Sequence, residues 1–537
     1  MATTIPSLNS APLAHSGDGD ASWGPDAAPD LGKLALYVGA FAGLTLYLAV
    51  ASVATIIFPP TMIAFAAPLA LIALAATPQG KAAPLRLAVT LVIIGTALLP
   101  VWPIYIHLKL GPLPIITPAR VLLYAVTALW AIDMISSPLR RAQLIAGLRA
   151  GGLVTWFALG MLALALFSLP LGQGRIAATT FTIRQVIIWF IPFCIAVTYI
   201  RNDRDFFRLI IALVCGAVLT SLIAINETHS EQLLAGTLAP LINTGAEWLQ
   251  LAQQQKIRDG VFRAQATHTH PLSLGEYIAL MAPFTLMLVF KSKTLIGRAS
   301  WTLALAILFG GALATNSRGA LLAIAISTVI AFVLVLRRMM RRRIGSRLAP
   351  VVGLIMFALI AGSPAGAFIA QKMVSGAGKT SAANSTQSRI DQIEKAWPKI
   401  LKRPVGGYGA GRGARVLGYW GRTLTIDNYY LSLALDYGFP GPIVFAALLS
   451  AVAMTAYRRS RDGRARGPKA LSANENEVLY VGLVAAIAAF AVTRTITSLG
   501  SNLAFMYIVF GAIAGAGVAR RRQFKNATKP PRTRVLF

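Results

Sequence analysis

Long apolar stretches recur along most of this 537-residue chain, and they restrict its possible folds more than any other feature. A transmembrane helix needs about 20 predominantly apolar residues. Fourteen segments meet this requirement, and because several are short or contain proline, twelve to fourteen spans are expected. The sequence therefore predicts an all-α, polytopic integral membrane protein. The predicted spans are 34–57, 61–77, 87–107, 119–136, 152–170, 184–200, 207–225, 273–290, 300–316, 319–336, 349–363, 438–456, 477–494 and 499–518.

The composition agrees with a membrane protein. Hydrophobic residues make up 56% of the chain and charged residues only 13%, whereas soluble domains are roughly 25% charged. This excludes a disordered chain, a coiled coil and an ordinary cytosolic enzyme. The two cysteines, Cys194 and Cys215, lie in apolar runs, so neither a disulfide framework nor a cysteine metal site is indicated.

The two ends of the chain differ from its centre. Residues 1–33 are rich in Ala, Pro, Asp and Ser without an apolar period, which predicts a disordered cytoplasmic tail. Residues 34–518 form the predicted transmembrane domain, and residues 519–537 a basic cytoplasmic tail. A cleavable signal peptide is not expected, because the N-terminal tail lacks a basic region before the first apolar run.

Lysine and arginine give the orientation. With the N-terminus inside and the spans alternating, the basic clusters all fall on the cytoplasmic side, as the positive-inside rule requires. We therefore expect both termini in the cytoplasm and assign the net charge of +31 to membrane topology and anionic lipids, not to nucleic acid. The clusters are Lys81/Arg86, Arg140/Arg141/Arg149, Arg201/Arg204/Arg208, Lys291/Lys293/Arg298, Arg337 to Arg347, Arg458 to Lys469, and the tail from Arg520.

Two segments on the opposite, non-cytoplasmic side are long, 226–272 and 364–437, and loops of this length are usually functional. In the second, Ile390, Ile393 and Trp397 form one apolar stripe of a helix predicted over 385–397, which Pro398 would end. The glycine-rich run 404–413 that follows lacks the Lys-Ser/Thr ending of a phosphate-binding loop, so we reject it as a nucleotide motif.

Arginine is unexpectedly frequent on this outer side of the membrane. A single such arginine is explained by snorkelling or solvation. As a set, planar guanidinium groups at a membrane interface suit the oxygens of a lipid-linked diphosphate. The arginines at predicted outer helix ends are Arg120, Arg184, Arg318 and Arg494, and those in the long loops include Arg263, Arg389, Arg403, Arg412, Arg415 and Arg422.

A metal site is not expected. His268 and His270 are two residues apart with no third ligand beside them, which favours a structural or substrate-contact role over zinc. Two Asp-x-Asp spacings, at 18–20 and 203–205, fall in the tail and in a short cytoplasmic loop, so a sugar-nucleotide transferase is not favoured.

Four motifs, in order, carry a resemblance to a known family. They are Arg263 to Pro271 with its His-Thr-His-Pro ending, Ser317-Arg318-Gly319, the run Arg389 to Trp397 followed by Pro404 and Gly407-Tyr408-Gly409, and Asp427-Asn428 followed after nine residues by Gly438-x-x-Gly441. From about residue 100 onward the chain resembles the O-antigen ligase and Wzy-type O-antigen polymerase superfamily of bacterial envelopes. In one position it departs from the family pattern, because Asp427 stands where a histidine is usual.

The resemblance implies an integral-membrane glycosyltransferase (GT-C-like) fold with a large outer loop and an active site facing the periplasm. The donor would be a glycan on undecaprenyl diphosphate, with no cofactor and no metal, since arginine would stabilise the charge of the leaving group. By this resemblance Arg318 and Arg263 are the first diphosphate contacts. Further substrate contacts would be Arg184, Arg389, Arg412, His270, Asn428 and Tyr408.

Asp427 has three interpretations. As a carboxylate it can deprotonate the acceptor hydroxyl, or bind sugar hydroxyls without acting as a base. It can also be only the N-cap of the helix that starts in the following Tyr-Tyr-Leu run. By resemblance, an aspartate here is more in keeping with a polymerase than with a ligase.

The sequence thus favours a polymerase of exported polysaccharide, which transfers the growing glycan to a lipid-linked repeat unit. A ligase that hands the glycan to lipid A-core or another acceptor is the near alternative. A lipid-linked oligosaccharide flippase is a third, although no internal repeat is visible and the ionisable residues cluster at helix ends. A chain-length regulator and a flippase are the expected protein partners.

Overall fold

The computed structural model describes residues 39, 43, 82–103, 106, 117–171, 175–238, 256–258, 260–343, 380–419, 426–461 and 477–527. The predicted spans 61–77 and 349–363, the predicted tail 1–33, and 34–57 apart from residues 39 and 43, lie outside the described residues. All helices and strands below belong to one compact unit, Ala66–Phe537.

Eleven of the fourteen predicted spans fall on described residues, and each corresponds to an apolar helix. Eight helices are long enough to cross a membrane, and three apolar helices are shorter. The polytopic membrane architecture is therefore confirmed over the described residues. The long ones are α4 (Pro118–Ser136), α6 (Leu153–Leu171), the continuous span Ile176–Tyr199, α9 (Asp203–Ser230), α12 (Pro271–Lys291), α13 (Leu295–Ala314), α14 (Arg318–Arg343) and α20 (Pro440–Arg461), and the shorter ones α3 (Leu85–Val101), α21 (Glu477–Arg494) and α22 (Leu503–Ala527).

The span Ile176–Tyr199 is built from α7 (Arg175–Gln185), the π-helical turn η1 (Val186–Phe190) and α8 (Ile191–Tyr199). The remaining elements are short or lie between spans. These are α5 (Pro138–Gly151), α10 (Leu234–Leu238), the antiparallel strands β1 (Ile257–Arg258) and β2 (Val261–Phe262), α17 (Thr380–Lys402), α18 (Gly413–Val416) and α19 (Tyr429–Tyr437).

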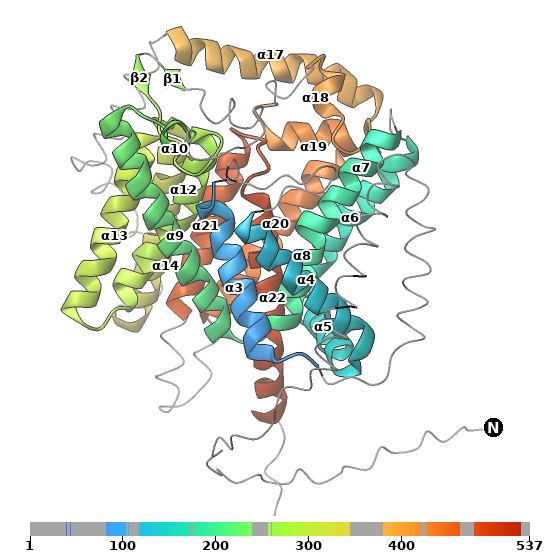
Figure 1. The fold of residues 1–537 in the computed structure, drawn as a ribbon, viewed down its shortest axis with the longest axis vertical. Coiled ribbons are helices and arrows are strands. Elements are labelled where there is room, and N and C mark those ends of the chain that lie inside the picture. The colour runs from blue at the N-terminus through green and yellow to red at the C-terminus, as the bar shows by residue number, and fades with distance from the viewer. Residues whose placement is uncertain are drawn as a thin grey trace, which may run out of the picture. The chain divides into compact units, whose positions relative to one another are not determined.

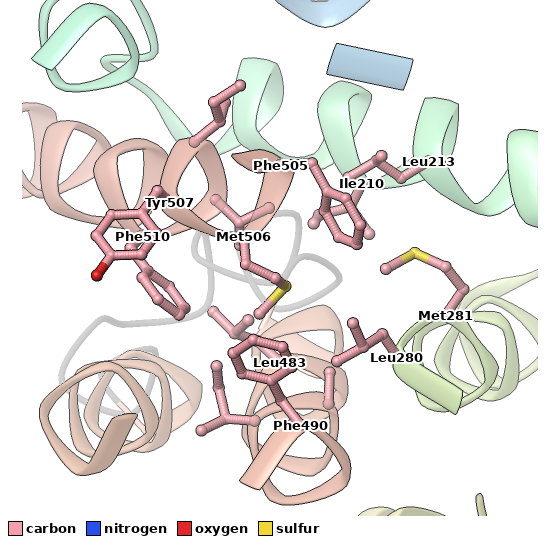
Figure 2. Packing of buried hydrophobic residues seen from close by; sticks show 14 of the residues in the cluster. Ile210, Leu213, Leu280, Met281, Leu483, Phe490, Phe505, Met506, Tyr507 and Phe510 are labelled. Atoms are coloured by element: carbon pink, nitrogen blue, oxygen red, sulfur yellow. The ribbon is translucent and has the colours of Figure 1, made fainter. Parts of the chain in front are cut away.

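Helix α12 is the most enclosed of the long spans and lies at the centre of the bundle, against α9, α13, α14 and α21. Figure 2 shows side chains of α9, α12, α21 and α22 meeting in one apolar core. Small residues bring the helices together, because Gly275 of α12 faces Ala320 of α14 and Gly311 of α13 faces Ser221 of α9. The residues described in the next section are thus attached to closely packed central helices.

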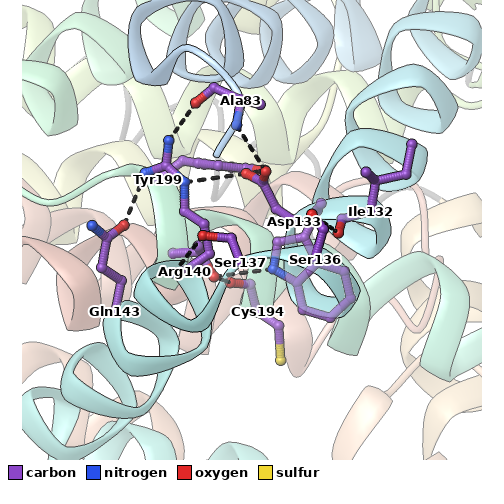
Figure 3. Close-up of polar contacts among 11 residues, drawn as sticks. Ala83, Ile132, Asp133, Ser136, Ser137, Arg140, Gln143, Cys194 and Tyr199 are labelled. Carbon is purple, nitrogen blue, oxygen red and sulfur yellow. Dashed lines mark hydrogen bonds and ion pairs between the residues drawn. The ribbon is translucent and has the colours of Figure 1, made fainter. Parts of the chain in front are cut away.

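One end of the bundle, here called the basic end, collects described residues of several clusters that were predicted to be cytoplasmic. Asp133 binds Arg140 through Nε (3.1 Å) and accepts a hydrogen bond from Tyr199 (2.9 Å), as Figure 3 shows. Beside this group, Arg459 lies over the ring of Tyr480, which donates to Asp203. Basic segments far apart in the chain therefore meet at one end.

The opposite end, here called the α17 end, carries the β1–β2 hairpin, α17, α18 and α19, and Figure 1 shows α17 lying across it. The predicted end of this helix at Pro398 is wrong, since α17 continues to Lys402. A proline inside a helix removes one hydrogen bond and crowds the carbonyl four residues earlier, but the residues after Pro398 continue the helix here. The predicted stripe of Ile390, Ile393 and Trp397 is exposed, whereas Gln392, Ala396 and Ile400 face the bundle.

Candidate functional site

Arg263, one of the two arginines expected to bind diphosphate, lies at the α17 end against the turn that precedes the other, Arg318. The Nε of Arg263 donates to the carbonyl of Thr315 at 3.0 Å, three residues before Arg318. The backbone follows the same path, because the N–H of Ala264 donates to the carbonyl of Ala314 at 3.0 Å. The segment before α12 therefore lies against the turn between α13 and α14.

Both segments contain a residue in the left-handed region, Ala266 with φ 49° and Asn316 with φ 46°. For alanine this conformation costs about 1–2 kcal/mol, so surrounding contacts must hold it. The buried carboxylate of Glu227 does so by accepting from the N–H groups of Gln265 (2.9 Å) and Ala266 (2.8 Å). Glu227 also accepts from Leu234 of α10 at 2.7 Å, which makes it the anchor of this loop.

Two helix N-termini also meet here. His270 caps α12, with its Nδ1 accepting from the N–H of Leu272 at 3.1 Å, and Ser317 caps α14 by accepting from Ala320 at 3.3 Å. Each N-terminus carries a partial positive charge that favours an anion. Together with Arg263 and Arg318, they make this corner of the bundle suited to phosphate oxygens.

The ring of His270 is neutral at physiological pH. Burial, reinforced by the nearby charges of Arg263 and Lys256, lowers its pKa to about 4. Because Nδ1 is the acceptor of the cap, the proton of the neutral ring lies on Nε2. His270 can thus act on a substrate only as a neutral hydrogen-bond donor.

Asp427 lies just before α19, and it is not the cap of that helix. The cap is Asn428, whose Oδ1 accepts from the N–H of Leu431 at 3.1 Å. The backbone N–H of Asp427 donates to Gln392 of α17 at 2.8 Å, so the outer helix fixes its position. Burial raises the pKa of the Asp427 carboxyl, and the opposing charge of Arg389 lowers it.

The glycine-rich run wraps around the end of α19. The buried carboxylate of Asp436 accepts hydrogen bonds from the N–H groups of Gly413 (2.7 Å) and Gly411 (3.0 Å). The N–H of Tyr408, which follows Gly407, donates to the carbonyl of Leu435 at 2.9 Å. Gly407, with φ 57°, lies so close to the backbone of Asp436 that a side chain would collide with it. The glycines therefore serve close packing.

This loop places Arg412 against α7, since Gly411 lies on the ring of Phe181, one turn from Arg184. Arg184 is exposed and Arg412 half-buried. Tyr408 is buried, its hydroxyl donates to the carbonyl of Lys399 at 3.1 Å, and its ring lies 5.0 Å from the guanidinium carbon of Arg403. Arg412, Arg184 and Tyr408 thus form a flank separate from the Arg263–Arg318 corner.

A buried ion pair connects the corner to α19, and sequence reasoning missed it. Arg494, noted above only as an outer arginine, donates from Nη2 to Glu276 of α12 at 2.5 Å, with both side chains enclosed. Glu276 also accepts from Thr493 and Asn502, each at 2.8 Å. The Arg494 guanidinium carbon lies 5.4 Å from the ring of Tyr429, two residues after Asp427.

In the sequence, Glu276 and Arg494 gave only a weak signal. Glu276 is a lone charge near the start of one apolar segment, and Arg494 is a lone charge at the end of another. Their pairing depends on α12 and α21 lying side by side, which no local pattern reveals. The same holds for Glu227 and Asp436, whose partners are backbone N–H groups of distant loops. Among the described residues, no group of three His, Cys, Asp or Glu side chains is placed to hold a metal ion.

The fold and the α17 end define a class, a multi-pass membrane protein with a cation-rich polar site at one end of its helical bundle. Residues 303–446 match the profile of a family described as O-Antigen ligase (Wzy_C). The resemblance is therefore confirmed over these residues, and it implies a membrane enzyme that transfers glycan from a lipid-linked substrate. No curated protein matches the chain.

The matched residues include Arg318, Arg389, Arg412 and Asp427 but not Arg184, Arg263 or His270. The first of the four motifs, 263–271, thus lies outside the match. Its link to the family segment is the contact between Arg263 and the turn before Arg318.

Proposed function

We propose that the protein is a polysaccharide polymerase. It transfers a growing glycan from undecaprenyl diphosphate to the next lipid-linked repeat unit at the periplasmic face of the bacterial inner membrane. The observation that carries this proposal is the carboxylate of Asp427, which does not cap its helix. The positive charge of Arg389 acts on this carboxylate. It lies at the same end of the bundle as Arg263 and the turn before Arg318.

These groups match the requirements of the reaction. The acceptor hydroxyl attacks the anomeric carbon, the bond from that carbon to the diphosphate oxygen breaks, and undecaprenyl diphosphate leaves. Asp427 takes the hydroxyl proton, and a raised pKa brings a carboxylate nearer to the pH at which it works as a base. Arg263 and Arg318, with the N-termini of α12 and α14, stabilise the diphosphate charge.

The other predicted contacts have secondary roles in this proposal. His270 donates from Nε2 to a phosphate or sugar oxygen, and Asn428 holds the start of α19 by capping it. Arg412, Arg184 and Tyr408 line the flank toward α7, where a long glycan would extend. The reaction proposed here uses neither a metal nor a cofactor.

A ligase is the second candidate, favoured by the description of the matched family. A ligase and a polymerase share the donor and differ in the acceptor. Asp427 in the place of the usual histidine is the feature that leads us to prefer the polymerase. An outward-facing oligosaccharide flippase remains a weaker alternative.

The test is complementation of a deletion host with wild type, Asp427→Asn and Arg318→Ala, followed by electrophoresis of the surface glycan. A polymerase deletion leaves single repeat units on their normal acceptor, and both variants should reproduce that pattern. Arg415→Ala and Glu394→Gln, which change an exposed arginine and an exposed carboxylate of the same region, should behave as wild type.

Full-length glycan that accumulates on undecaprenyl diphosphate, with none on the acceptor, would establish a ligase and refute the polymerase. Wild-type behaviour of both Asp427→Asn and Arg318→Ala would refute the proposed site. Repeat units that remain on the cytoplasmic face in the deletion host would instead support the flippase.

A further inference from the structure

Helix α17 presents an apolar stripe that no described part of the chain covers. Ile390, Ile393, Trp397 and Leu401 follow one another at intervals of three and four residues, and each is 43–54% exposed. The neighbouring face of the same helix, with Gln392, Ala396 and Ile400, is buried against α19 and the loop around it. Helix α17 is therefore held against the bundle by one face, while the stripe lies on a different face of the same helix.

The stripe continues into the lipid-facing surface of two transmembrane helices. The ring of Trp397 packs edge-on against Phe439, directly before α20, at 6.1 Å between centroids. Beyond it lie Ile443 of α20 and Val405, 64% and 63% exposed. Arg403, at the end of α17, donates to the carbonyl of Leu171, the exposed last residue of α6, at 2.9 Å. Exposed apolar residues of spans α6 and α20 thus lie next to the end of α17 that carries Trp397 and Leu401.

The charged residues of α17 flank the stripe. Exposed Lys395 and Lys402 lie on the side of the helix turned away from the stripe, whereas exposed Glu394 lies at the edge of the stripe, one helical turn from Ile390 and from Trp397. Tryptophan and lysine are also the residues that anchor helices at membrane interfaces. Exposed aliphatic side chains next to a lipid-facing surface have a partner in the bilayer that they lack in water.

We propose that α17 is an interfacial helix, seated in the headgroup and upper acyl region of the membrane leaflet at the α17 end, with Ile390, Ile393, Trp397 and Leu401 in contact with lipid. A second copy of the chain or a partner protein fits less well, because either one would have to cover the lipid-facing residues of α6 and α20 as well.

Insertion of α17 into the membrane interface has a consequence for the position of Asp427, and this consequence rests on the proposed function. Gln392, on the buried side of α17, holds the N–H of Asp427 at 2.8 Å. A helix fixed at the interface therefore fixes Asp427 at the depth of the phosphates, where the diphosphate of a polyprenyl lipid lies. The membrane itself becomes part of the positioning of the site.

The test measures depth and needs no activity, so its failure and that of the proposed function are distinguishable. Single cysteines replace Ile393 and Trp397 in the stripe, and Lys395 and Lys402 on the far side as matched controls. The background carries Cys215→Ser, because Cys215 is the exposed one of the two native cysteines. Each variant is labelled with the fluorophore NBD and reconstituted in vesicles of phosphatidylethanolamine and phosphatidylglycerol.

We expect doxyl-labelled lipid to quench NBD at positions 393 and 397 at least about twofold more than at 395 and 402, and aqueous iodide to show the reverse order. Adding Ile390→Asp and Leu401→Asp to the Trp397→Cys variant should reduce the quenching by doxyl lipid. Equal iodide quenching at all four positions would overturn the proposal in favour of a solvated face. Protection of 393 and 397 from both quenchers would overturn it in favour of a protein partner or a second copy.

Discussion

At the scale of single residues, burial and the charge of Arg389 act in opposite directions on the pKa of Asp427. Burial favours the neutral carboxyl and raises its pKa, whereas the guanidinium of Arg389 favours the carboxylate and lowers it. The balance leaves the pKa above the ordinary value of an aspartate. A base of this kind loses activity as the pH falls through its pKa.

Replacing Arg389 should therefore move the acidic limb of the pH profile to higher pH. In Arg389→Gln the burial effect remains and the opposing charge is lost, so the pKa of Asp427 rises further. The measurement is kcat/KM with purified lipid-linked donor between about pH 4 and 8. Arg389→Lys, which keeps the charge, should leave the limb near its wild-type position, and an unshifted limb in Arg389→Gln would rule out Asp427 as the titrating base.

Glu227 shows how one side chain holds a strained loop. Glu227→Ala leaves buried N–H groups of Gln265, Ala266 and Leu234 without an acceptor, at a cost of about 1–3 kcal/mol for each. We expect a clear fall in the apparent melting temperature in detergent, faster protease cleavage near Arg263, and weakened diphosphate binding. Glu394→Ala, an exposed carboxylate, serves as the control and should change none of the three.

At the scale of elements, α12, α21 and α19 are linked by charge inside an apolar bundle. Glu276 of α12 and Arg494 of α21 form an enclosed ion pair, and Arg494 lies against Tyr429 of α19. A buried pair of this kind is costly to break from one side, because the remaining charge has no partner. The pair thereby fixes the register between the central helix and the helix that follows Asp427.

Glu276→Leu or Arg494→Leu alone should destabilise the protein by about 3–5 kcal/mol, whereas the double replacement should recover a large part of that loss. Unfolding in detergent of the wild type, both single variants and the double variant gives the coupling energy directly. A double variant as unstable as the sum of the single variants would mean that the two side chains act independently.

At the scale of the whole molecule, charge separates the two ends of the bundle. The basic segments around residues 140, 201 and 459 gather at the basic end, and the arginines of the candidate site lie at the α17 end. The grouping is what the positive-inside rule requires if the basic end is cytoplasmic. The orientation itself stays a prediction.

A C-terminal fusion to green fluorescent protein, which fluoresces in the cytoplasm and not after export through the general secretory pathway, tests it. We expect fluorescence from that fusion, together with labelling of Arg415→Cys in whole cells by a maleimide that does not cross the inner membrane. An unlabelled Cys215→Ser background provides the control. A dark fusion with labelling only after cell lysis would reverse the orientation.

The sequence by itself determined the helical membrane class and the spans that fall on the described residues, because about 20 apolar residues in a row have few other stable states than a helix in lipid. The family resemblance suggested Arg263, Arg318 and Asp427 as site residues, and their roles stay predictions. The sequence did not determine that α17 runs past Pro398, because a helix beyond a proline depends on what it packs against.

Only the tertiary structure decided which of these residues lie close together. Asn428 took the cap and left Asp427 free of that role, and Arg263 met the turn before Arg318 across more than fifty residues of chain. Arg494 could not be told apart from the other outer arginines in the sequence, but in the structure it is buried and paired with Glu276. The physical reason is that burial, pairing and pKa depend on neighbours, and neighbours far apart in the chain are chosen by the packing of whole helices.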